Sequence, residues 1–353
     1  MPHRIAPRIE AVSTSTAGLV GEAGQGPTDQ AVLVTSLSEF QGVFGGPQPG
    51  QDLFPGVDQF FDNGGRRAWV VRLGGRGLPD VRHGLAALDD VDDLNLLCLP
   101  SLAAGRILAE GAAYARGRRA FFLGDPAASR RATLEAVRAV PAADAGHAAV
   151  YFPRLRVPDP LQPSRTRLVG PAASVAGLLA RTDRERGVWA VAAGTTAHVA
   201  GAVGLASAVD DRAAATLRAR GVNAIREAPG HGIVAWGART VGGEADEWKY
   251  VPVRRLALFI EESLDRGLQW TVFEPNDEPT WNLVRRQVEA FLEELHRQGA
   301  FAGATPETSY LVRCGEDTMT QSDLNQGILI VEVGVAPLRP AEFVIFRIHR
   351  KRS

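Results

Sequence analysis

Short apolar runs alternate with Ala-rich segments over the first half of the chain. The runs are rich in aromatic and β-branched residues and have the length of strands, whereas the segments between several of them carry apolar residues at helical spacing. The strand-like runs are Thr16–Gly21, Arg67–Leu73, Leu94–Leu99, Arg119–Gly124 and Ala148–Arg154, and the helical segments are Leu53–Phe61, Ala103–Gly117 and Ala127–Val140. Strands and helices in alternation predict an α/β domain with a mainly parallel sheet and helices on its faces.

Punctuating residues predict where several of these elements end. Asn63, Gly64 and Gly65 follow the helix that begins at Leu53 and form a plausible C-terminal stop. The stretch Arg156–Arg167 contains three prolines and little periodicity, so we expect an exposed loop there. A helix over Ala172–Arg181 is expected to follow it.

The composition changes at Arg239–Val251 from Ala and Gly toward charged and aromatic residues, and two amphipathic helices follow. Apolar residues form one stripe in each helix, and the second helix has Pro near its start and Gly just past its end. The stripes are Val253, Leu256, Ile260 and Leu264, with Gly267 expected as a left-handed cap, and Trp281, Val284, Val288, Phe291 and Leu295, bounded by Pro279 and Gly299. We expect a smaller C-terminal α+β domain built on these helices.

Two strands close the chain. Gly327–Val335 is the first, a turn through Pro337 and Pro340 follows, and Phe343–His349 is the last. A terminal strand on a Pro-containing connection can pair within its own subunit or be donated to the sheet edge of a neighbour.

Composition narrows the class of protein. The chain has 353 residues, of which 45% are hydrophobic and 22% charged, as in ordinary folded proteins, and this length favours two domains. The formal net charge of -1 leaves no excess field for nucleic acid or an anionic membrane surface. Cys98 and Cys314 lie in apolar surroundings and are expected to be buried thiols. The N-terminus lacks the apolar run of a signal peptide, so we expect the chain to be made and folded in the cytoplasm.

The sequence carries no recognisable catalytic or metal-binding motif. There is no HExxH, GxSxG or P-loop, and the Gly170–Ser174 stretch is better explained as a helix start. His198 and His231 flank Gly-rich segments that could form a site, but hydrogen-bonded loop histidines are the simpler interpretation. Asn63–Arg67 could bind an anion, although a helix stop followed by two arginines for an intersubunit ion pair is simpler. We therefore expect no enzyme, no cofactor and no metal.

Several stretches resemble the contractile tail sheath proteins of myophage tails, R-type pyocins and extracellular contractile injection systems. The densest is Gly237–Ile260, which continues into Glu261, Glu262 and Ser263. The others are Val12–Thr16, Phe61–Ala68, Arg181–Trp189, Gly194–Ala197, Phe273–Asn276, Trp281, Cys314–Thr318, Asn325–Gly327 and Val335–Phe343. The resemblance spans nearly the whole chain.

The resemblance implies a structural subunit that forms six-fold rings, stacked helically around an inner tube, and that drives the tube outward when the sheath contracts. Its implied partners are copies of itself, the tube protein, and baseplate and terminal cap proteins, with assembly in the bacterial cytoplasm as part of a phage tail or tail-like particle that is released by lysis. Phage, pyocin-like particle and injection system all stay open, and the compact length favours the latter two. A non-sheath cap or baseplate adaptor is the nearest alternative, and a hydrolase is a more distant one.

In the family, terminal arms add strands to a neighbour's C-terminal domain, and the small domain accepts strands from neighbouring subunits. By resemblance the donated strand comprises Phe343, Val344, Ile345, Phe346, Arg347 and Ile348, and the accepting sheet comprises Ile328, Leu329, Ile330, Val331, Glu332 and Val333. Only Met1–Pro7 precede the stretch that matches the family near Arg8. Either the N-terminal arm is very short, or the start codon is misplaced, or the subunits are linked by one arm only. The hypothesis we carry forward is that a shortened arm weakens the link between subunits.

The predicted organisation has four segments. They are a short N-terminal arm (1–16), an outer and middle α/β domain (17–239), a tube-facing C-terminal domain (240–336) and a C-terminal arm (337–353). Charged faces of the two amphipathic helices offer candidate tube or intersubunit contacts, with a solvated helix face as the alternative for each residue. The candidates are Arg254, Arg255, Glu261, Glu262, Arg285, Arg286, Glu293 and Glu294.

Overall fold

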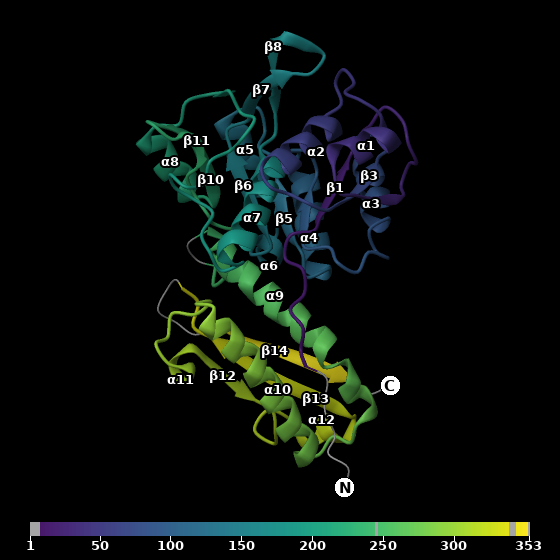
Figure 1. Cartoon of the computed structure of the whole chain (residues 1–353), viewed down its shortest axis with the longest axis vertical. Helices are drawn as coiled ribbons and strands as arrows, with labels where there is room; N and C mark the ends of the chain where they lie inside the picture. The colour runs from purple at the N-terminus through teal and green to yellow at the C-terminus, as the bar shows by residue number, and fades with distance from the viewer. Residues whose placement is uncertain (1–7, 244–245, 339–343, 352–353) are drawn as a thin grey trace. The chain divides into compact units, whose positions relative to one another are not determined.

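The computed structural model describes residues 8–243, 246–338 and 344–351, which form two compact units (Figure 1). The large unit is continuous and runs from Ser13 to Arg255. The small unit takes its described residues from the segments 1–12 and 256–353. The chain thus divides inside a helix, later than the boundary at 239 and 240 that composition predicts.

An eight-stranded sheet is the centre of the large unit, in the order β11-β10-β6-β5-β4-β1-β3-β2. The six inner strands are parallel, and the edge strands β11 and β2 are antiparallel to their neighbours. The bounds are β1 Ala17–Gly21, β2 Ala31–Val34, β3 Ala68–Arg72, β4 Leu96–Cys98, β5 Phe121–Gly124, β6 Ala148–Phe152, β10 Val222–Ala228 and β11 Gly232–Ala235. The expected parallel sheet is confirmed.

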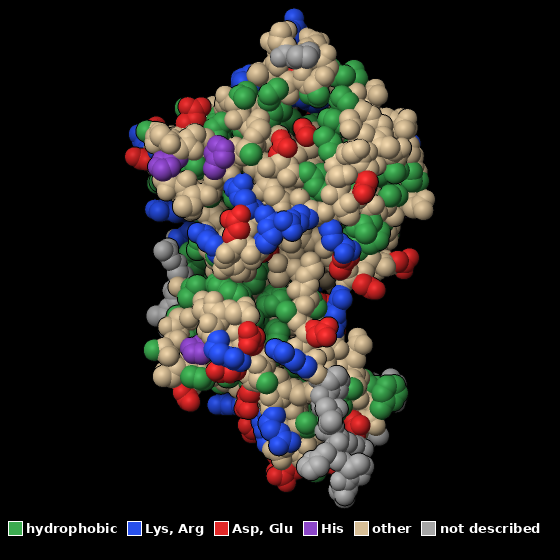
Figure 2. Space-filling model, in the orientation of Figure 1, with side chains coloured by type: hydrophobic (Ala, Val, Ile, Leu, Met, Phe, Trp, Pro, Cys, Tyr) green, Lys and Arg blue, Asp and Glu red, His purple; other side chains and the backbone are tan. Residues whose placement is uncertain are grey.

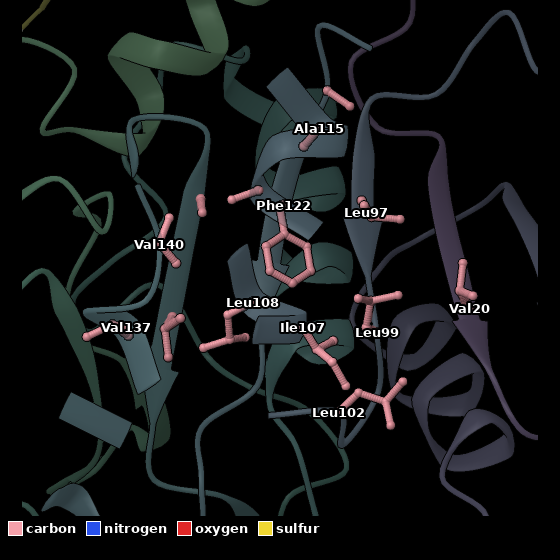
Figure 3. Packing of buried hydrophobic residues seen from close by; sticks show 14 of the residues in the cluster. Val20, Leu97, Leu99, Leu102, Ile107, Leu108, Ala115, Phe122, Val137 and Val140 are labelled. Atoms are coloured by element: carbon pink, nitrogen blue, oxygen red, sulfur yellow. The ribbon is translucent and has the colours of Figure 1, made fainter. Parts of the chain in front are cut away.

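Helices cover both faces of this sheet, which is why strands such as β1, β5 and β6 are buried along their whole length. Phe122 and Leu97 point to one face and join a core with Ile107, Leu108 and Val137 from the helices there (Figure 3). On the other face α2 and α7 pack against each other and against the central strands. The helices are α1 Leu37–Phe44, α2 Leu53–Asp62, α3 Leu78–Ala86, α4 Gly105–Gly117, α5 Arg130–Val137, α6 Ala142–Ala145, α7 Ala172–Arg186 and α8 Asp211–Arg218.

The segment predicted as a loop at Arg156–Arg167 is instead a β-hairpin. Strands β7 (Leu155–Asp159) and β8 (Gln162–Val169) pair antiparallel, and β9 (Gly204–Leu205) pairs with the other side of β7. The three prolines occupy places where the ladder tolerates a missing N–H: Pro158 at a register shift, Pro160 in the turn and Pro163 in the edge strand. Proline content alone was therefore a misleading signal.

The small unit combines helices with a three-stranded antiparallel sheet in the order β12-β13-β14. Its two long helices, which the sequence periodicity predicts, lie over the sheet (Figure 1). Phe259 and Phe291 pack between these helices with their ring centroids 6.1 Å apart. The bounds are α9 Val251–Gly267, a 3-10 helix η2 Gln269–Phe273, α10 Glu278–Arg297, α11 Pro306–Ser309, β12 Tyr310–Arg313, α12 Gln321–Asn325, β13 Ile328–Val335 and β14 Val344–Lys351.

Glycines at three helix ends test the predicted caps. Gly64 has φ of 110° just after α2, and Gly299 has φ of 81° just after α10, so both stops are confirmed. Gly267 is wrong as a left-handed cap because it is the last helical residue of α9. Packing explains a glycine at this position, because a Cβ at residue 267 would lie only 2.7 Å from Cγ1 of Ile9.

The segment between the composition change and α9 belongs to the large unit. The Val241 N–H donates to the Ala148 carbonyl at 2.8 Å, and Asn223 Nδ2 donates to the Arg239 carbonyl at 2.7 Å. These hydrogen bonds tie residues 239–241 to the large sheet. Cys98 and Cys314 are free and buried, as expected.

Candidate assembly interface

Strand β13 is the centre of the small sheet and is paired unequally on its two sides. On one side β12 covers only Glu332–Val335. On the other side β14 pairs with the full length of β13, from Ile328 opposite Lys351 to Val335 opposite Val344. The strand predicted to accept a donated strand is thus covered by the chain's own last strand.

Side chains close the rest of β13 on the β12 side. Asn276 Nδ2 donates to the Ile328 carbonyl at 3.0 Å, and Thr318 Oγ1 donates to the Ile330 carbonyl at 3.0 Å. Because these carbonyls are already satisfied, a strand from another chain fits β13 best in the place that β14 occupies.

Strand β14 has two different faces. Phe346 and Ile348 are buried, whereas Arg347 points to solvent with 63% of its side chain exposed and lies 3.7 Å from the carboxylate of Glu332 on β13. Val344 and Ile345 belong to the strand, and Phe343, the first residue of the predicted donated segment, lies outside the described residues. The alternation is that of an antiparallel strand with one covered face.

The connection from β13 to β14 starts in a fixed position. The Ala336 N–H donates to the Ser309 carbonyl at 2.8 Å, and the Ala336 carbonyl accepts from the Ala302 N–H at 2.9 Å. Pro337 forms an isolated bridge with Phe301. The described start of the connection is therefore held within the small unit as far as Pro337.

Residues near the N-terminus pack on α9 within the small unit. Ile9 is buried, and the Val12 N–H donates to Ser263 Oγ at 3.2 Å. Met1–Pro7, the part of the predicted arm before this segment, lie outside the described residues.

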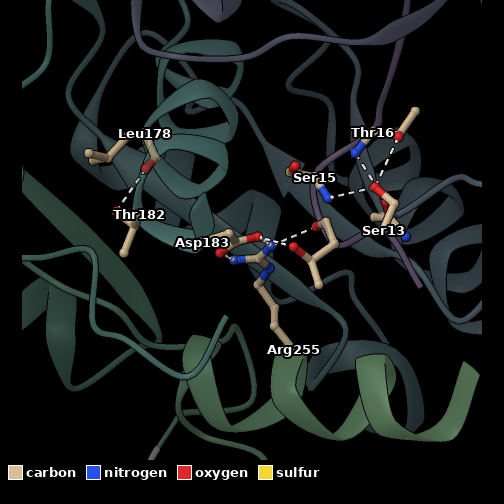
Figure 4. Close-up of polar contacts among 9 residues, drawn as sticks. Ser13, Ser15, Thr16, Leu178, Thr182, Asp183 and Arg255 are labelled. Atoms are coloured by element: carbon tan, nitrogen blue, oxygen red, sulfur yellow. Dashed lines mark hydrogen bonds and ion pairs between the residues drawn. The ribbon is translucent and has the colours of Figure 1, made fainter. Parts of the chain in front are cut away.

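The structure places Arg254 and Arg255 in the interior of the large unit. Arg254 pairs with His147 and stacks on the Trp248 ring at 4.3 Å. Arg255 forms a two-pronged ion pair with Asp183, at 2.8 and 2.6 Å, and donates to the Thr14 carbonyl (Figure 4). Both guanidinium groups are occupied within the chain, so the surface proposed below consists of the other six candidates.

Those six candidates lie on the small unit, whose visible face carries mixed acidic and basic side chains (Figure 2). Glu262 pairs with Arg266 at 2.7 Å, and Glu294 pairs with Arg297 at 3.0 Å. Glu293 accepts from the Tyr310 hydroxyl at 3.1 Å, and Arg285 donates to the Cys314 carbonyl. The remaining two are Glu261, partly buried, and Arg286, exposed.

Phe273 is an exposed aromatic residue that the periodicity of the helices does not reveal. It ends η2, inside the Phe273–Asn276 stretch, and 84% of it is exposed. Phe273 belongs to neither amphipathic stripe, and this could have indicated from the sequence that its ring is exposed.

Two other features are absent from the part of the chain that the structure describes. It contains no group of three or more His, Cys, Asp or Glu side chains that could hold a metal ion. None of its helices combines the length and apolar character that crossing a bilayer requires.

A strand at the edge of a sheet presents backbone groups with which another chain can pair, so the small sheet has the form of a possible assembly surface. Comparisons with known proteins agree with this interpretation. The family model for the phage tail sheath C-terminal domain matches residues 244–351. The tail sheath protein of Vibrio phage KVP40 is 27% identical over 183 residues, which are 51% of this chain and 26% of that protein, so the chain spans about a quarter of that curated relative.

Solved structures extend the likeness to the whole chain. The anti-feeding prophage helical sheath in its contracted state has a TM-score of 0.81 and 29% identity, and the match covers 97% of this chain and 95% of that one. The contracted sheath complex of an extracellular contractile injection system, PVC, has a TM-score of 0.79 and 28% identity, with 97% and 94% covered. The Listeria innocua sheath tail protein Lin1278, 11% identical with a TM-score of 0.72 and 98% and 96% covered, shares the fold. The chain is thus similar to contractile tail sheath proteins over nearly its whole length, and its last third matches the family model of their C-terminal domain.

Proposed function

We propose that this chain is the structural subunit of a contractile sheath. Copies polymerise as stacked hexameric rings around an inner tube, and contraction of the stack drives the tube outward. The observation that carries the proposal is β14, a terminal edge strand that pairs with the whole of β13 and is joined to it by a Pro-containing connection. The similarity to sheaths solved in the contracted state supports it.

Exchange of β14 between copies gives a link that survives sliding. The main-chain hydrogen bonds of β14 are the same whether β13 belongs to its own chain or to a neighbour, so exchange costs few contacts. The chain from Pro337 to Val344 can span at most about 25 Å when extended, which limits the reach of the donated strand. Subunits linked in this way remain joined while their other surfaces rearrange.

The remaining partners of the proposal follow from the same family. The inner tube protein meets the small unit, where Glu261, Glu262, Arg285, Arg286, Glu293 and Glu294 offer charged contacts, and baseplate and cap proteins bind the ends of the cylinder. A relative solved within the anti-feeding prophage baseplate supports a place next to a baseplate. The role is structural, without catalysis, and assembly takes place in the bacterial cytoplasm before release by lysis.

Removing β14 tests the need for the strand. A chain that ends before Val344 keeps the large unit intact, so we expect a folded protein that forms no cylinders in electron micrographs. A chain that lacks only Arg352 and Ser353 is the matched control and is expected to assemble. Cylinders formed by the longer truncation would show that β14 is not the link.

A disulfide placed across β13 and β14 tests whether the strand is exchanged. Glu332 and Arg347 face each other in the register, so the pair Glu332→Cys and Arg347→Cys is close enough to form a disulfide bond. In assembled cylinders it should join different chains and give a ladder on a non-reducing denaturing gel. The control pair Glu332→Cys and Arg313→Cys, opposite each other in β13 and β12, should close within one chain. A monomer band alone from the first pair in cylinders contradicts strand exchange.

A further inference from the structure

Arg350 is a cation on the covered face of β14. Alternate residues of a strand share a face, so Arg350 lies on the same face as Phe346 and Ile348, which are buried. Only 16% of the Arg350 side chain is exposed. Its Nη2 lies 3.3 Å from Oδ1 of Asp265 on α9, whose side chain is 23% exposed. An ion pair thus stands where the pattern of the strand calls for an apolar contact.

This ion pair is poorly suited to a purely stabilising role. Nε and Nη2 of Arg350 are buried and have no hydrogen-bond partner, although Nη2 lies near the Asp265 carboxylate. The guanidinium also lines a small cavity together with Leu329, Glu274 and Asn276. Burying a charge without full hydrogen bonding costs free energy, so a well-packed apolar residue would hold the strand at least as firmly. Inward-pointing charges on edge strands serve instead to reject wrong pairings.

The pair also fixes the register of β14. Arg350 lies opposite Leu329 on β13, and this register brings the guanidinium to Asp265. A slip by one residue would turn Arg350 to the other face, because side chains alternate along a strand. A slip by two would leave Asp265 opposite a different residue of the strand. The apolar pattern alone does not exclude such a slip, because it keeps Phe346 and Ile348 on the covered face.

We propose that Arg350 and Asp265 are the specificity-determining pair of strand exchange. When β14 of one copy pairs with β13 of another, Arg350 of the first copy forms the ion pair with Asp265 of the second. A strand without this arginine, or with the arginine in another register, binds less well. The inference rests on the exchange of β14 proposed above and assigns the residues that select the partner strand.

Charge-reversed copies test this inference through mixing. Asp265→Arg and Arg350→Asp, each alone, place like charges together in every exchanged strand, so each should raise the protein concentration needed for assembly by about tenfold or more. An equal mixture of the two single variants should recover assembly, because half of the possible donor and acceptor combinations are complementary. The cylinders from the mixture should contain both variants in alternation.

The double variant, Asp265→Arg with Arg350→Asp, provides a readout that does not depend on the single variants folding. It should form cylinders of its own and exclude wild-type copies carrying a fluorescent label. The control reverses Arg131 and Glu135, an exposed ion pair on α5 outside the exchanged strand, and this double variant should mix freely with the wild type.

The outcomes separate this inference from the proposed function. Free mixing of the reversed double variant with the wild type, or single variants that assemble normally, overturns the specificity role while the disulfide ladder still reports exchange. Rescue by the double variant but not by the mixture, together with a monomer band in the disulfide test, means that β14 pairs within its own chain, and both proposals then fail.

Discussion

The ion pair of Arg255 with Asp183 is buried in the large unit. The two side chains are 4% and 5% exposed. The Thr14 hydroxyl donates a hydrogen bond to Asp183 Oδ2 at 2.7 Å, and the Thr14 carbonyl accepts one from Arg255. Figure 4 shows the ion pair. Removing one partner leaves a buried charge without compensation. We expect Asp183→Ala to lower the free energy of unfolding by about 3–5 kcal/mol, measured by chemical denaturation.

An exposed pair of the same chemistry is the control for that measurement. Arg131 and Glu135 form an i,i+4 pair at 2.9 Å on the surface of α5. We expect Glu135→Ala to change the free energy of unfolding by less than about 1 kcal/mol. Equal losses in the two variants would contradict the importance of burial.

Asp125 makes the stability of the large unit depend on pH. Burial raises the pKa of its carboxyl group to about 6, although the N–H groups of Ser101 and Ala172 donate to it at 2.6 and 2.8 Å. The unfolded chain has a lower pKa, so the folded state binds the proton more tightly. This contribution to stability is fully present below about pH 4 and is lost as the pH rises through about 6.

Asp125→Asn removes this titrating carboxyl group, so the difference between the wild type and the variant reports the effect of Asp125 alone. We expect the unfolding free energy of the wild type minus that of the variant to fall by about 3 kcal/mol between pH 4 and pH 7.5. Urea denaturation at several pH values measures the difference. A difference independent of pH would show that the carboxyl group titrates alike in both states.

At the scale of elements, the end of α9 shows a conflict between helix propensity and packing. Alanine favours a helix over glycine by up to about 1 kcal/mol, but a Cβ at Gly267 would lie 2.7 Å from Ile9 Cγ1. We expect Gly267→Ala to destabilise the small unit by about 1–3 kcal/mol, as measured by thermal unfolding. The combination with Ile9→Ala removes the clash, so the alanine at 267 should cost nothing in that background; an equal cost in both backgrounds would mean that the clash is not its cause.

Elements whose signal is local were predictable from the sequence. The stripes of α9 and α10 and the apolar runs of β1, β3, β4, β5 and β6 identified those elements, because burial of one helix face or of a whole strand leaves a direct trace in residue type. The hairpin of β7 and β8 was missed because its prolines are tolerated only through a register shift and an open edge. Those features depend on pairing partners that the sequence does not name.

The candidate interface was predictable to a similar extent. The positions of β13 and β14 follow from their apolar runs, within about one or two residues at their ends. The burial of Arg254 and Arg255 could not be foreseen, since it depends on His147 and Asp183, far away in sequence. Asp265 was likewise missed as the partner of Arg350, although a charge in phase with Phe346 and Ile348 was a visible anomaly.

At the scale of the whole molecule, assembly should change the protection of one strand above all. Among the described residues of the single chain β14 is an edge strand that pairs with β13 alone, so its amides open at a low free-energy cost. The central strands β4 and β5 are covered on both faces and open only when the large unit unfolds.

Hydrogen–deuterium exchange of the monomer and of assembled cylinders measures this contrast. In the monomer we expect the amides of β14 to exchange at least about a hundredfold faster than those of β5, because an opening that costs about 3 kcal/mol less is that much more frequent. In cylinders β14 is held by a neighbour that is itself held by others, so detaching one strand no longer frees it, and its exchange should slow toward that of β5. The exposed hairpin of β7 and β8 is the internal reference, since the proposed exchange leaves its pairing within one chain. If β14 exchanges equally fast in both states while the hairpin is unchanged, the strand takes no part in holding the cylinder together.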